Sequence, residues 1–188
     1  MNRIAPRGAL IVLLLGAALA ACAPGARAAG SSRKASKDAA PKDAAGSSKL
    51  KWYSFDEGSK LAAKNHKAML VDVYTDWCGW CKRMDASTYK DSLVITELNA
   101  DFVPIKLNAE HDDEELTYKG EKMTARRLAG EVFGVTGYPC TMFLKADGEV
   151  ISPLPGYREA PLFTLILKFI GTGAYQKQKW PEFQKANS

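Results

Sequence analysis

A Cys-x-x-Cys motif, Cys78-Gly-Trp-Cys81, constrains this chain more than any other part of its sequence. The motif follows an apolar run over residues 69–75, which is typical of a β-strand, and leads into residues that favour a helix. Two cysteines three residues apart in the first turn of a helix can close a disulfide. The first of them then lies among unpaired backbone amides at the positive end of the helix dipole, which promotes the thiolate form. The pattern predicts a reactive dithiol where a strand meets a helix.

The same motif forms half of some zinc sites, which need four ligands and usually a second cysteine pair. The chain has two further cysteines, Cys22 and Cys140, and two histidines, His66 and His111. All four are single residues in distant parts of the sequence, and His66 lies at the polar end of a helix predicted over residues 56–67. We therefore interpret the motif as a redox-active disulfide, with no metal ion and no organic cofactor.

The N-terminus has the pattern of an export signal. A basic segment, residues 1–7, precedes an apolar run, residues 8–20, that is too short to span a bilayer comfortably. The run ends in Leu-Ala-Ala before Cys22 and resembles a bacterial lipobox, which implies lipidation of Cys22 and stable membrane anchoring. No aspartate follows Cys22, which favours the outer membrane, at the periplasmic face of the envelope. A secretory signal cut after Ala20 or Ala28, giving a soluble periplasmic protein, is the alternative.

The sequence thus divides into a lipoprotein signal peptide (1–21), a lipidated cysteine with a flexible tether (22–48), a globular domain (49–175) and a C-terminal extension (176–188). The tether has no aromatic or large aliphatic residue, so it cannot bury enough apolar surface to offset its ordering entropy. Residues 1–48 hold seven basic and two acidic residues, whereas residues 49–188 hold nineteen of each. The domain is neutral, which argues against nucleic-acid binding.

An aspartate interrupts the apolar run before the motif. Burying the carboxylate of Asp72 has a large desolvation cost unless it is paired or protonated. The segment from Leu70 to Lys82, Leu-Val-Asp-Val-Tyr-Thr-Asp-Trp-Cys-Gly-Trp-Cys-Lys, resembles thioredoxin, whose buried aspartate has the same place before Trp-Cys-Gly-Pro-Cys-Lys. The resemblance implies that Asp72 accepts and returns the proton of the second cysteine, Cys81. An aspartate at an exposed edge, without a chemical role, is the alternative.

A lysine interrupts a second apolar segment. Residues 102–108 predict a strand, and Lys106 is the charged residue within it. Thioredoxins have a lysine in the matching Lys-Leu-Asn segment, near the buried aspartate. The resemblance implies that Lys106 pairs with Asp72, which lowers the cost of burying both charges and couples their titrations. An outward-facing lysine on an edge strand is the alternative.

Residues 110–131 are longer and more charged than the matching thioredoxin segment. The acidic run that begins at His111 suggests a cation site, because hard cations prefer clustered carboxylates, but it lacks the spacing of a calcium loop. Acidic residues are also favoured at the start of a helix. We therefore predict a helix N-terminus over residues 111–115, with Tyr118, Leu128 and Val132 facing the core.

A Gly-Tyr-Pro sequence, residues 137–139, is the second motif that points to the site. Tyr138-Pro139 lies between a glycine-rich loop and an apolar strand, a place that suits a cis peptide. In thioredoxin folds the cis-proline loop packs beside the dithiol and pairs with the substrate, so the resemblance makes Tyr138 and Pro139 a docking edge. Gly156 resembles the glycine that, in the same family, lets a substrate approach the active-site surface. Cys140 stands where the family often has threonine, and it is either a buried apolar residue or a third redox thiol.

The predicted order of elements is that of a thioredoxin fold across residues 50–172, an α/β fold with a central mixed β-sheet flanked by helices. It comprises a strand, the dithiol helix, a further strand and helix, the cis-proline loop, a hairpin at Asp147-Gly148 and a closing helix over residues 160–170. Within this fold, the Asp72 strand, the middle insert and the Gly-Tyr-Pro sequence are most similar to the branch that includes the C-terminal periplasmic domain of the membrane reductase DsbD.

The resemblance implies a thiol-disulfide oxidoreductase. Cys78 would attack a substrate disulfide and Cys81 would resolve the mixed disulfide, while Trp77, Gly79 and Trp80 form the contact surface around the sulfurs. The motif has no histidine between its cysteines, which favours a reductase over a strong oxidant.

A reductase outside the cytoplasm would reduce disulfides of exported proteins and would receive electrons from a membrane donor. The alternative is a metal-binding or cluster-binding protein, or a chaperone, that uses Cys78, Cys81 and Cys140 as thiol ligands.

Overall fold

The computed structural model describes residues 49–113 and 115–187. The signal peptide, Cys22 and the tether lie outside these residues, so their assignments stay predictions. The elements occur in the order α1 (Phe55–Asn65), β1 (Ala68–Tyr74), α2 (Gly79–Ala86), η2 (Thr88–Lys90), α3 (Ser92–Asp101), β2 (Phe102–Asn108), β3 (Glu115–Tyr118), β4 (Glu121–Thr124), α4 (Ala125–Arg127), η3 (Leu128–Val132), β5 (Cys140–Leu144), β6 (Val150–Pro155), α5 (Ala160–Gly171), η4 (Ala174–Gln176) and α6 (Trp180–Asn187).

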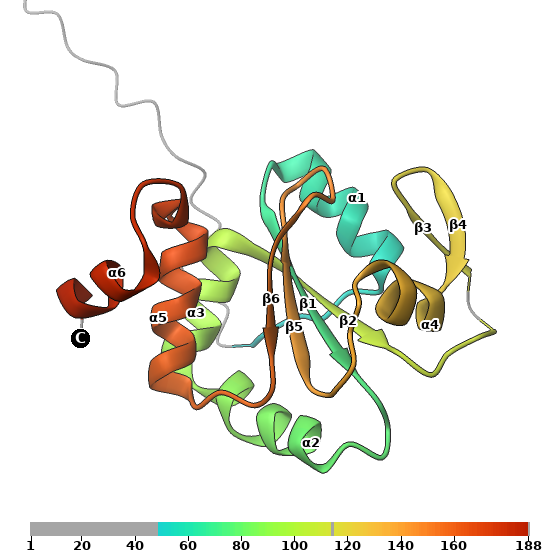
Figure 1. The fold of residues 1–188 in the computed structure, drawn as a ribbon, viewed down its shortest axis with the longest axis horizontal. Coiled ribbons are helices and arrows are strands. Elements are labelled where there is room, and N and C mark those ends of the chain that lie inside the picture. The colour runs from blue at the N-terminus through green and yellow to red at the C-terminus, as the bar shows by residue number, and fades with distance from the viewer. Residues whose placement is uncertain (1–48, 114, 188) are drawn as a thin grey trace, which may run out of the picture. The chain divides into compact units, whose positions relative to one another are not determined.

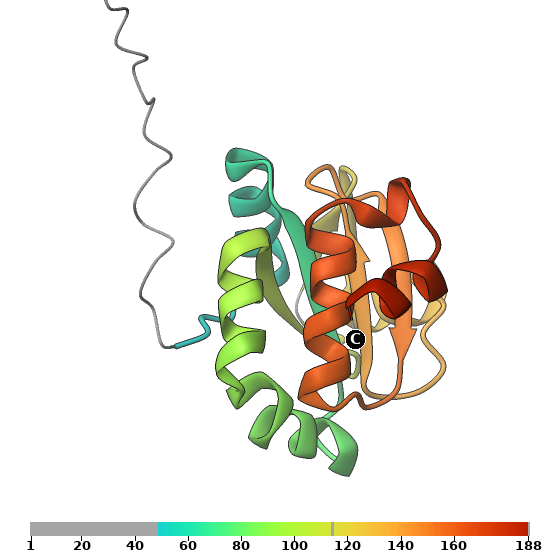
Figure 2. The same cartoon turned by 90° about the vertical axis from the view of Figure 1, so that its left-hand side faces the viewer.

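A four-stranded mixed sheet in the order β2-β1-β5-β6 forms the centre of the fold (Figure 1). β1 and β2 are parallel, whereas β5 is antiparallel to both of its neighbours, β1 and β6. α3 and α5 lie side by side over one face of the sheet, as Figure 2 shows, and α1 packs over the other with the β3–β4 hairpin. This arrangement confirms the predicted thioredoxin fold.

The alternation of side chains along β1 divides the core into two clusters. Leu70 belongs to the cluster formed with α2, α3 and α5, whereas Val71 and Val73 belong to the cluster formed with α1 and the hairpin. Successive residues of a strand point to opposite faces, so Asp72 shares the face of Leu70. The Asp72 carboxylate therefore faces the layer that contains α2, the helix with the dithiol.

The regular segments confirm the sequence-based expectations closely. The predicted strand over residues 102–108 is β2, and the predicted helix over residues 56–67 is α1, which ends at Asn65. His66 follows the last residue of this helix, as predicted, where it caps the helix in the left-handed conformation and is exposed. The hairpin predicted at Asp147-Gly148 joins β5 to β6, and Gly148 has the positive φ of 87° that favours glycine in such a turn.

The helix N-terminus predicted over residues 111–115 is wrong. The segment leads into the β3–β4 hairpin, in which Leu116 and Tyr118 are buried and Thr117 between them is exposed. The two loop residues, Lys119 and Gly120, both have positive φ angles, 50° and 84°, as a tight two-residue hairpin requires. The alternation of apolar and polar residues that indicates a strand covers only four residues here. The acidic run before it favours a helix start, so the strand was not recognised.

The core assignments in this insert are only partly correct. Tyr118 and Leu128 are buried as predicted, but Val132 is 42% exposed. Val132 ends the π-helical turn η3, where the backbone takes a wider turn than an α-helix does. The spacing of an ordinary helix therefore misplaces this side chain.

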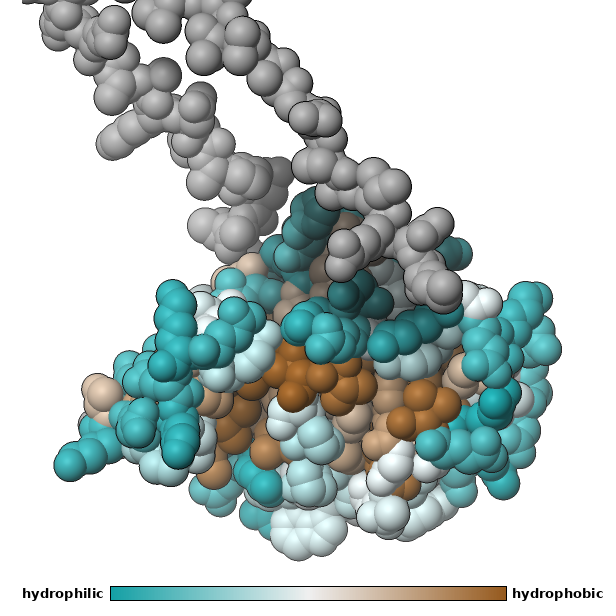
Figure 3. All heavy atoms as spheres, turned by 45° about the horizontal axis from the view of Figure 1, so that its top comes forward, coloured by the Kyte–Doolittle hydropathy of each residue, from teal (hydrophilic) through white to brown (hydrophobic). Residues whose placement is uncertain are grey.

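The C-terminal residues form α6, which packs against α5. Phe183 is buried, and its ring lies 5.1 Å from that of Phe169, while the ring of Trp180 lies 5.4 Å from Phe169. Figure 3 shows hydrophilic side chains around the rim of another face, with apolar residues visible between them. No helix within the described residues is long and apolar enough to cross a membrane.

One close packing contact joins α1 to the sheet. A Cβ atom on Gly58 would lie 2.3 Å from Cγ1 and 2.6 Å from Cδ1 of Ile105, which is fully buried in β2. Interatomic distances this short force a rearrangement of the core. Glycine at this position therefore lets the helix approach the sheet.

We predict that Gly58→Ala lowers the free energy of unfolding by ~1–2 kcal/mol, because overpacking outweighs the helix propensity that alanine gains. Urea unfolding followed by circular dichroism measures this change. Gly130→Ala is the matched control, because nothing lies within 4 Å of the position of its Cβ. An unchanged midpoint for Gly58→Ala would show that Ile105 moves aside without loss.

Candidate active site

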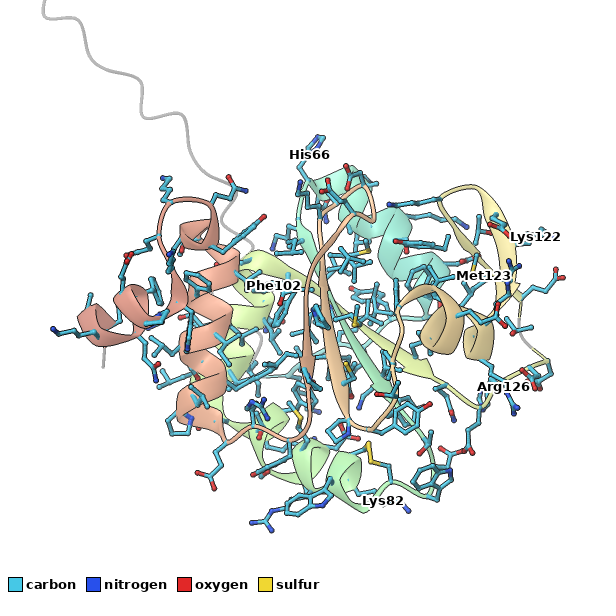
Figure 4. The ribbon with its side chains drawn as sticks, in the orientation of Figure 1. His66, Lys82, Phe102, Lys122, Met123 and Arg126 are labelled. Carbon is cyan, nitrogen blue, oxygen red and sulfur yellow. A yellow bond between two sulfur atoms is a disulfide. The ribbon has the colours of Figure 1, made fainter. Side chains whose placement is uncertain are left out.

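The dithiol lies where β1 gives way to α2. Cys78 is the N-cap residue of α2, and its Sγ accepts a hydrogen bond from the backbone amide of Cys81 at 3.0 Å. The two cysteines form a disulfide with their Cα atoms 5.3 Å apart. Figure 4 shows the disulfide beside Lys82, at the opposite end of the domain from His66. The predicted position of the dithiol at the start of a helix is therefore confirmed.

The surface around the disulfide is aromatic. Both cysteines are almost completely buried, whereas Trp77 is 67% and Trp80 55% exposed. A Cβ atom on Gly79 would meet nothing within 4 Å, so there is open space at Gly79, between Cys78 and Trp80. Large exposed apolar side chains on either side of a reactive group are typical of a contact surface for another molecule.

Two loops from distant parts of the chain meet at the dithiol helix. The Tyr138-Pro139 peptide is cis, and the carbonyl oxygen of Pro139 accepts a hydrogen bond from the amide of Gly156 at 2.8 Å. The ring of Trp77 lies 6.0 Å from that of Tyr138, edge to face. The structure thus brings together the predicted contact residues of the motif, the cis-proline loop and the Gly156 loop.

Two residues of this surface were missed by the sequence interpretation. Glu110 accepts a hydrogen bond from the indole nitrogen of Trp77 at 2.7 Å, and its own amide donates to Oδ1 of Asn108 at 3.1 Å. Tyr157 lies 5.5 Å from Trp80, ring centre to ring centre. Glu110 lies at the start of the charged segment 110–131, where nothing distinguishes it from the other acidic residues, and no local pattern indicates a role for Tyr157.

An ion-pair network lies on the α2 side of the sheet. Asp72 and Lys106 are directly opposite each other in the β1–β2 register, and Lys106 Nζ lies 2.5 Å from Asp72 Oδ2. The same nitrogen lies 2.5 Å from Oδ1 of Asp85 on α2. The predicted pairing is therefore present, and Lys106 additionally connects the sheet to the helix that carries the dithiol. Asp85 was not predicted, because nothing in the sequence indicates a second carboxylate at this lysine.

Aromatic rings surround the lysine of this network. Lys106 Nζ lies 4.7 Å from the ring centre of Trp52, 5.0 Å from that of Tyr74 and 5.4 Å from that of Tyr89. Ring faces attract a cation and exclude water at the same time. Burial alone would lower the pKa of Lys106, but the two carboxylates outweigh it and raise the pKa.

Asp72 remains the least favourably placed group of the network. Its side chain is 2% exposed, and its Oδ1 has no hydrogen-bond partner among the residues that the structure describes. Burial raises the pKa of Asp72, although the nearby positive charge of Lys106 opposes the effect. Such a carboxyl group changes its protonation state closer to neutral pH than an exposed aspartate does, which suits proton exchange with a buried thiol.

Cys140 packs in the cluster on the opposite face of the sheet. It pairs with Val73 in the β1–β5 register, and its Sγ lies 3.9 Å from Sδ of Met142. Burial raises the pKa of the Cys140 thiol, despite a hydrogen bond with the backbone of Leu154. This placement supports its interpretation as a core residue, which stays a prediction. Within residues 49–113 and 115–187, no group of three or more His, Cys, Asp or Glu side chains is arranged to hold a metal ion.

A disulfide at a helix N-terminus, a neighbouring cis-proline and a mixed four-stranded sheet define the thioredoxin-fold class. The chain belongs to the thioredoxin-like domain family, whose profile matches residues 55–171.

The chain is similar to several known proteins. It is 31% identical over 121 residues to the thiol:disulfide interchange protein DsbD of Pseudoalteromonas atlantica, which covers 61% of this chain and 18% of that protein. A putative disulphide-isomerase from Bacteroides thetaiotaomicron has a TM-score of 0.51 and 32% identity, covering 64% of this chain and 89% of that structure. A thioredoxin from Thermus thermophilus has a TM-score of 0.52 and 26% identity, covering 64% and 86%. The chain spans less than a fifth of the length of the DsbD proteins that it matches.

The network yields a prediction about stability and pH. A carboxyl group whose pKa is raised by folding binds more protons in the native state, so its ionisation lowers the free energy of unfolding as the pH rises. The free energy of unfolding of Asp72→Asn, taken relative to the parent protein, should therefore increase between about pH 5 and about pH 8, because only the parent has the buried carboxyl group that ionises. Urea unfolding at both pH values measures the difference.

Asp113→Asn is the control, because this exposed aspartate carries the same charge outside the network. If the relative stability of Asp72→Asn fell between the two pH values instead, the ion pair with Lys106 would outweigh the desolvation of the carboxylate.

Proposed function

We propose that this protein is a membrane-anchored, periplasmic thiol-disulfide oxidoreductase that reduces disulfides of exported proteins. The observation that carries the proposal is the Cys78–Cys81 disulfide at the N-terminus of α2, set beside the cis-proline edge. The redox group of the protein is then this disulfide itself, without an added cofactor. The names of its DsbD relatives, thiol:disulfide interchange proteins, support the same class of reaction.

The disulfide between Cys78 and Cys81 supports a reaction in two steps, because each thiol can reach the other. In the reduced protein, the Cys78 thiolate attacks one sulfur of a substrate disulfide, and the other substrate sulfur leaves as a thiolate. Cys81 then loses its proton, attacks Cys78 and releases the second substrate sulfur. The protein ends as the disulfide, and the substrate has gained two electrons and two protons as two thiols.

Asp72 is the proposed acceptor of the Cys81 proton. Cys81 is 3% exposed, so bulk water has little access to its thiol. Asp72 is ionisable, buried in the same layer of the fold and has a raised pKa because of its burial. Lys106 positions it through the ion pair and holds α2 through Asp85.

The location and the electron source rest on the N-terminal sequence. The apolar run and the lipobox-like ending before Cys22 support export and anchoring at the periplasmic face of the envelope, with the outer membrane favoured. A reductase in that compartment has to be recharged after each turnover. We propose a membrane protein that supplies electrons as its donor, and exported proteins with disulfides as its substrates.

The first test is the reduction of insulin disulfides by the protein, with dithiothreitol as the electron source. We predict that Cys78→Ser loses at least about 100-fold in rate, because no nucleophile remains. Cys81→Ser, reduced and then freed of dithiothreitol before insulin is added, should instead accumulate a mixed disulfide, which non-reducing electrophoresis detects. Turnover by Cys78→Ser at the rate of the parent protein would exclude this site.

The second test is the equilibrium reduction potential of the Cys78–Cys81 pair. A reductase of this kind should have a value near about −270 mV, whereas about −120 mV would identify an oxidant and reverse the proposed direction. Cys140→Ser should leave the potential unchanged, because Cys140 packs with Met142 in the other core cluster. A shift of tens of millivolts in this variant would make Cys140 part of the redox site.

A further inference from the structure

The four arginines of the described residues differ in their partners. Arg126 pairs with Asp112, and Arg127 pairs with Glu121 and Glu131, all on or beside the β3–β4 insert. Within the same described ranges, Arg83 and Arg158 have no carboxylate within 4.0 Å. These two unpaired arginines are the ones that lie at the active-site surface.

Aromatic rings hold the guanidinium group of Arg83. Its Cζ lies 5.3 Å from the ring centre of Trp80 and 5.5 Å from that of Tyr157. The two rings are themselves 5.5 Å apart, and the hydroxyl of Tyr157 is 3.3 Å from Oγ of Ser87 at the end of α2. A guanidinium fixed over aromatic rings keeps its charge and its outward N–H donors, and loses little entropy when it binds an anion.

The second arginine extends the same positive surface. Arg158 Nη1 donates to the carbonyl oxygen of Tyr157 at 2.8 Å and lies 3.4 Å from the position of a Cβ on Gly156. The amide of Gly156 in turn donates to Pro139. Both guanidinium groups are therefore tied to loops that border the disulfide.

The other side of the disulfide has the opposite charge. Glu110 binds the indole nitrogen of Trp77, and Asp76 beside it is exposed. Residues 49–188 carry no net charge, so local charges contribute to how a charged partner is oriented at the site. The exposed Lys82, which follows the motif directly, adds to the positive charge on the Arg83 side.

Resting on the function proposed above, we propose that Arg83, supported by Arg158, is a docking point for an acidic side chain of the disulfide substrate. Arg83 lies five residues after Cys78, which is roughly 7–8 Å along a helix axis. A strand advances about 3.3 Å per residue. An acidic residue a few positions from the substrate cysteine that Cys78 attacks would therefore come within reach of the Arg83 side chain.

The test uses two peptides that differ only in a Glu or a Lys two positions from a single cysteine. Each cysteine is held in a mixed disulfide with 2-mercaptoethanol, which carries no charge. The protein is reduced beforehand, and its single-turnover rate constant with each peptide is measured by mass spectrometry. We expect the Glu peptide to react about three to five times faster than the Lys peptide, the range of an exposed ion pair.

Charge reversal makes the prediction specific. Arg83→Glu should reverse the preference, so that the Lys peptide reacts faster, and Arg83→Gln should remove it. Arg127→Glu is the matched control, because it makes the same change in net charge on the insert, and it should keep the preference for Glu. In about 1 M salt, where the screening length is about 3 Å, the preference should largely disappear.

The results separate this proposal from the proposed function. If the reduced parent protein also reacts with bis(2-hydroxyethyl) disulfide, the oxidoreductase chemistry is present irrespective of peptide charge. Equal rates with the two peptides, or a Glu preference that survives in Arg83→Glu, would then overturn the docking proposal alone. Failure to reduce the small disulfide would contradict the proposed function, and the docking proposal would fall with it.

Discussion

The burial of the Asp72 carboxylate is the constraint on which the rest of the site depends. A carboxylate in the middle strand of a sheet is tolerable only with a cation beside it, and the parallel β1–β2 register places Lys106 there. The lysine reaches a second carboxylate, Asp85, so the ion pair also fixes the dithiol helix to the sheet. The aromatic rings around Lys106 complete the arrangement, because ring faces close to the ammonium group attract its charge and cover part of its side chain.

The active site lies on the boundary between this buried network and the solvent. The disulfide and Asp72 are buried, whereas Trp77 and Trp80, the neighbours of the two cysteines in the sequence, are exposed. Disulfide exchange uses both environments: the substrate must reach one sulfur, and the second sulfur needs a proton acceptor shielded from water. The contact surface also carries opposite charges on its two sides. Glu110 lies on the Trp77 side, and Arg83 lies on the Trp80 side.

Much of this protein was predictable from local patterns. The apolar runs identified β1 and β2, and the Cys-x-x-Cys motif identified the start of α2, because in these segments the period and the neighbouring polar residues agree. The β3–β4 hairpin was not predicted, since its strands are only four residues long and follow an acidic run that also suits a helix start. Val132 was misplaced for a related reason, as the π-helical turn shifts side chains away from the spacing of an α-helix.

The sequence by itself determined the reactive group and the type of fold, because Cys78, Cys81 and Asp72 lie within a single continuous segment. The spacing of these residues and the apolar run around Asp72 can be recognised directly along the chain. Only the tertiary structure decided the surroundings of that group. Glu110 reaches Trp77 across 33 positions of the sequence, and Tyr157 reaches Ser87 across 70. Such contacts depend on which loops the sheet order brings to one end of the strands, and no local periodicity encodes that proximity.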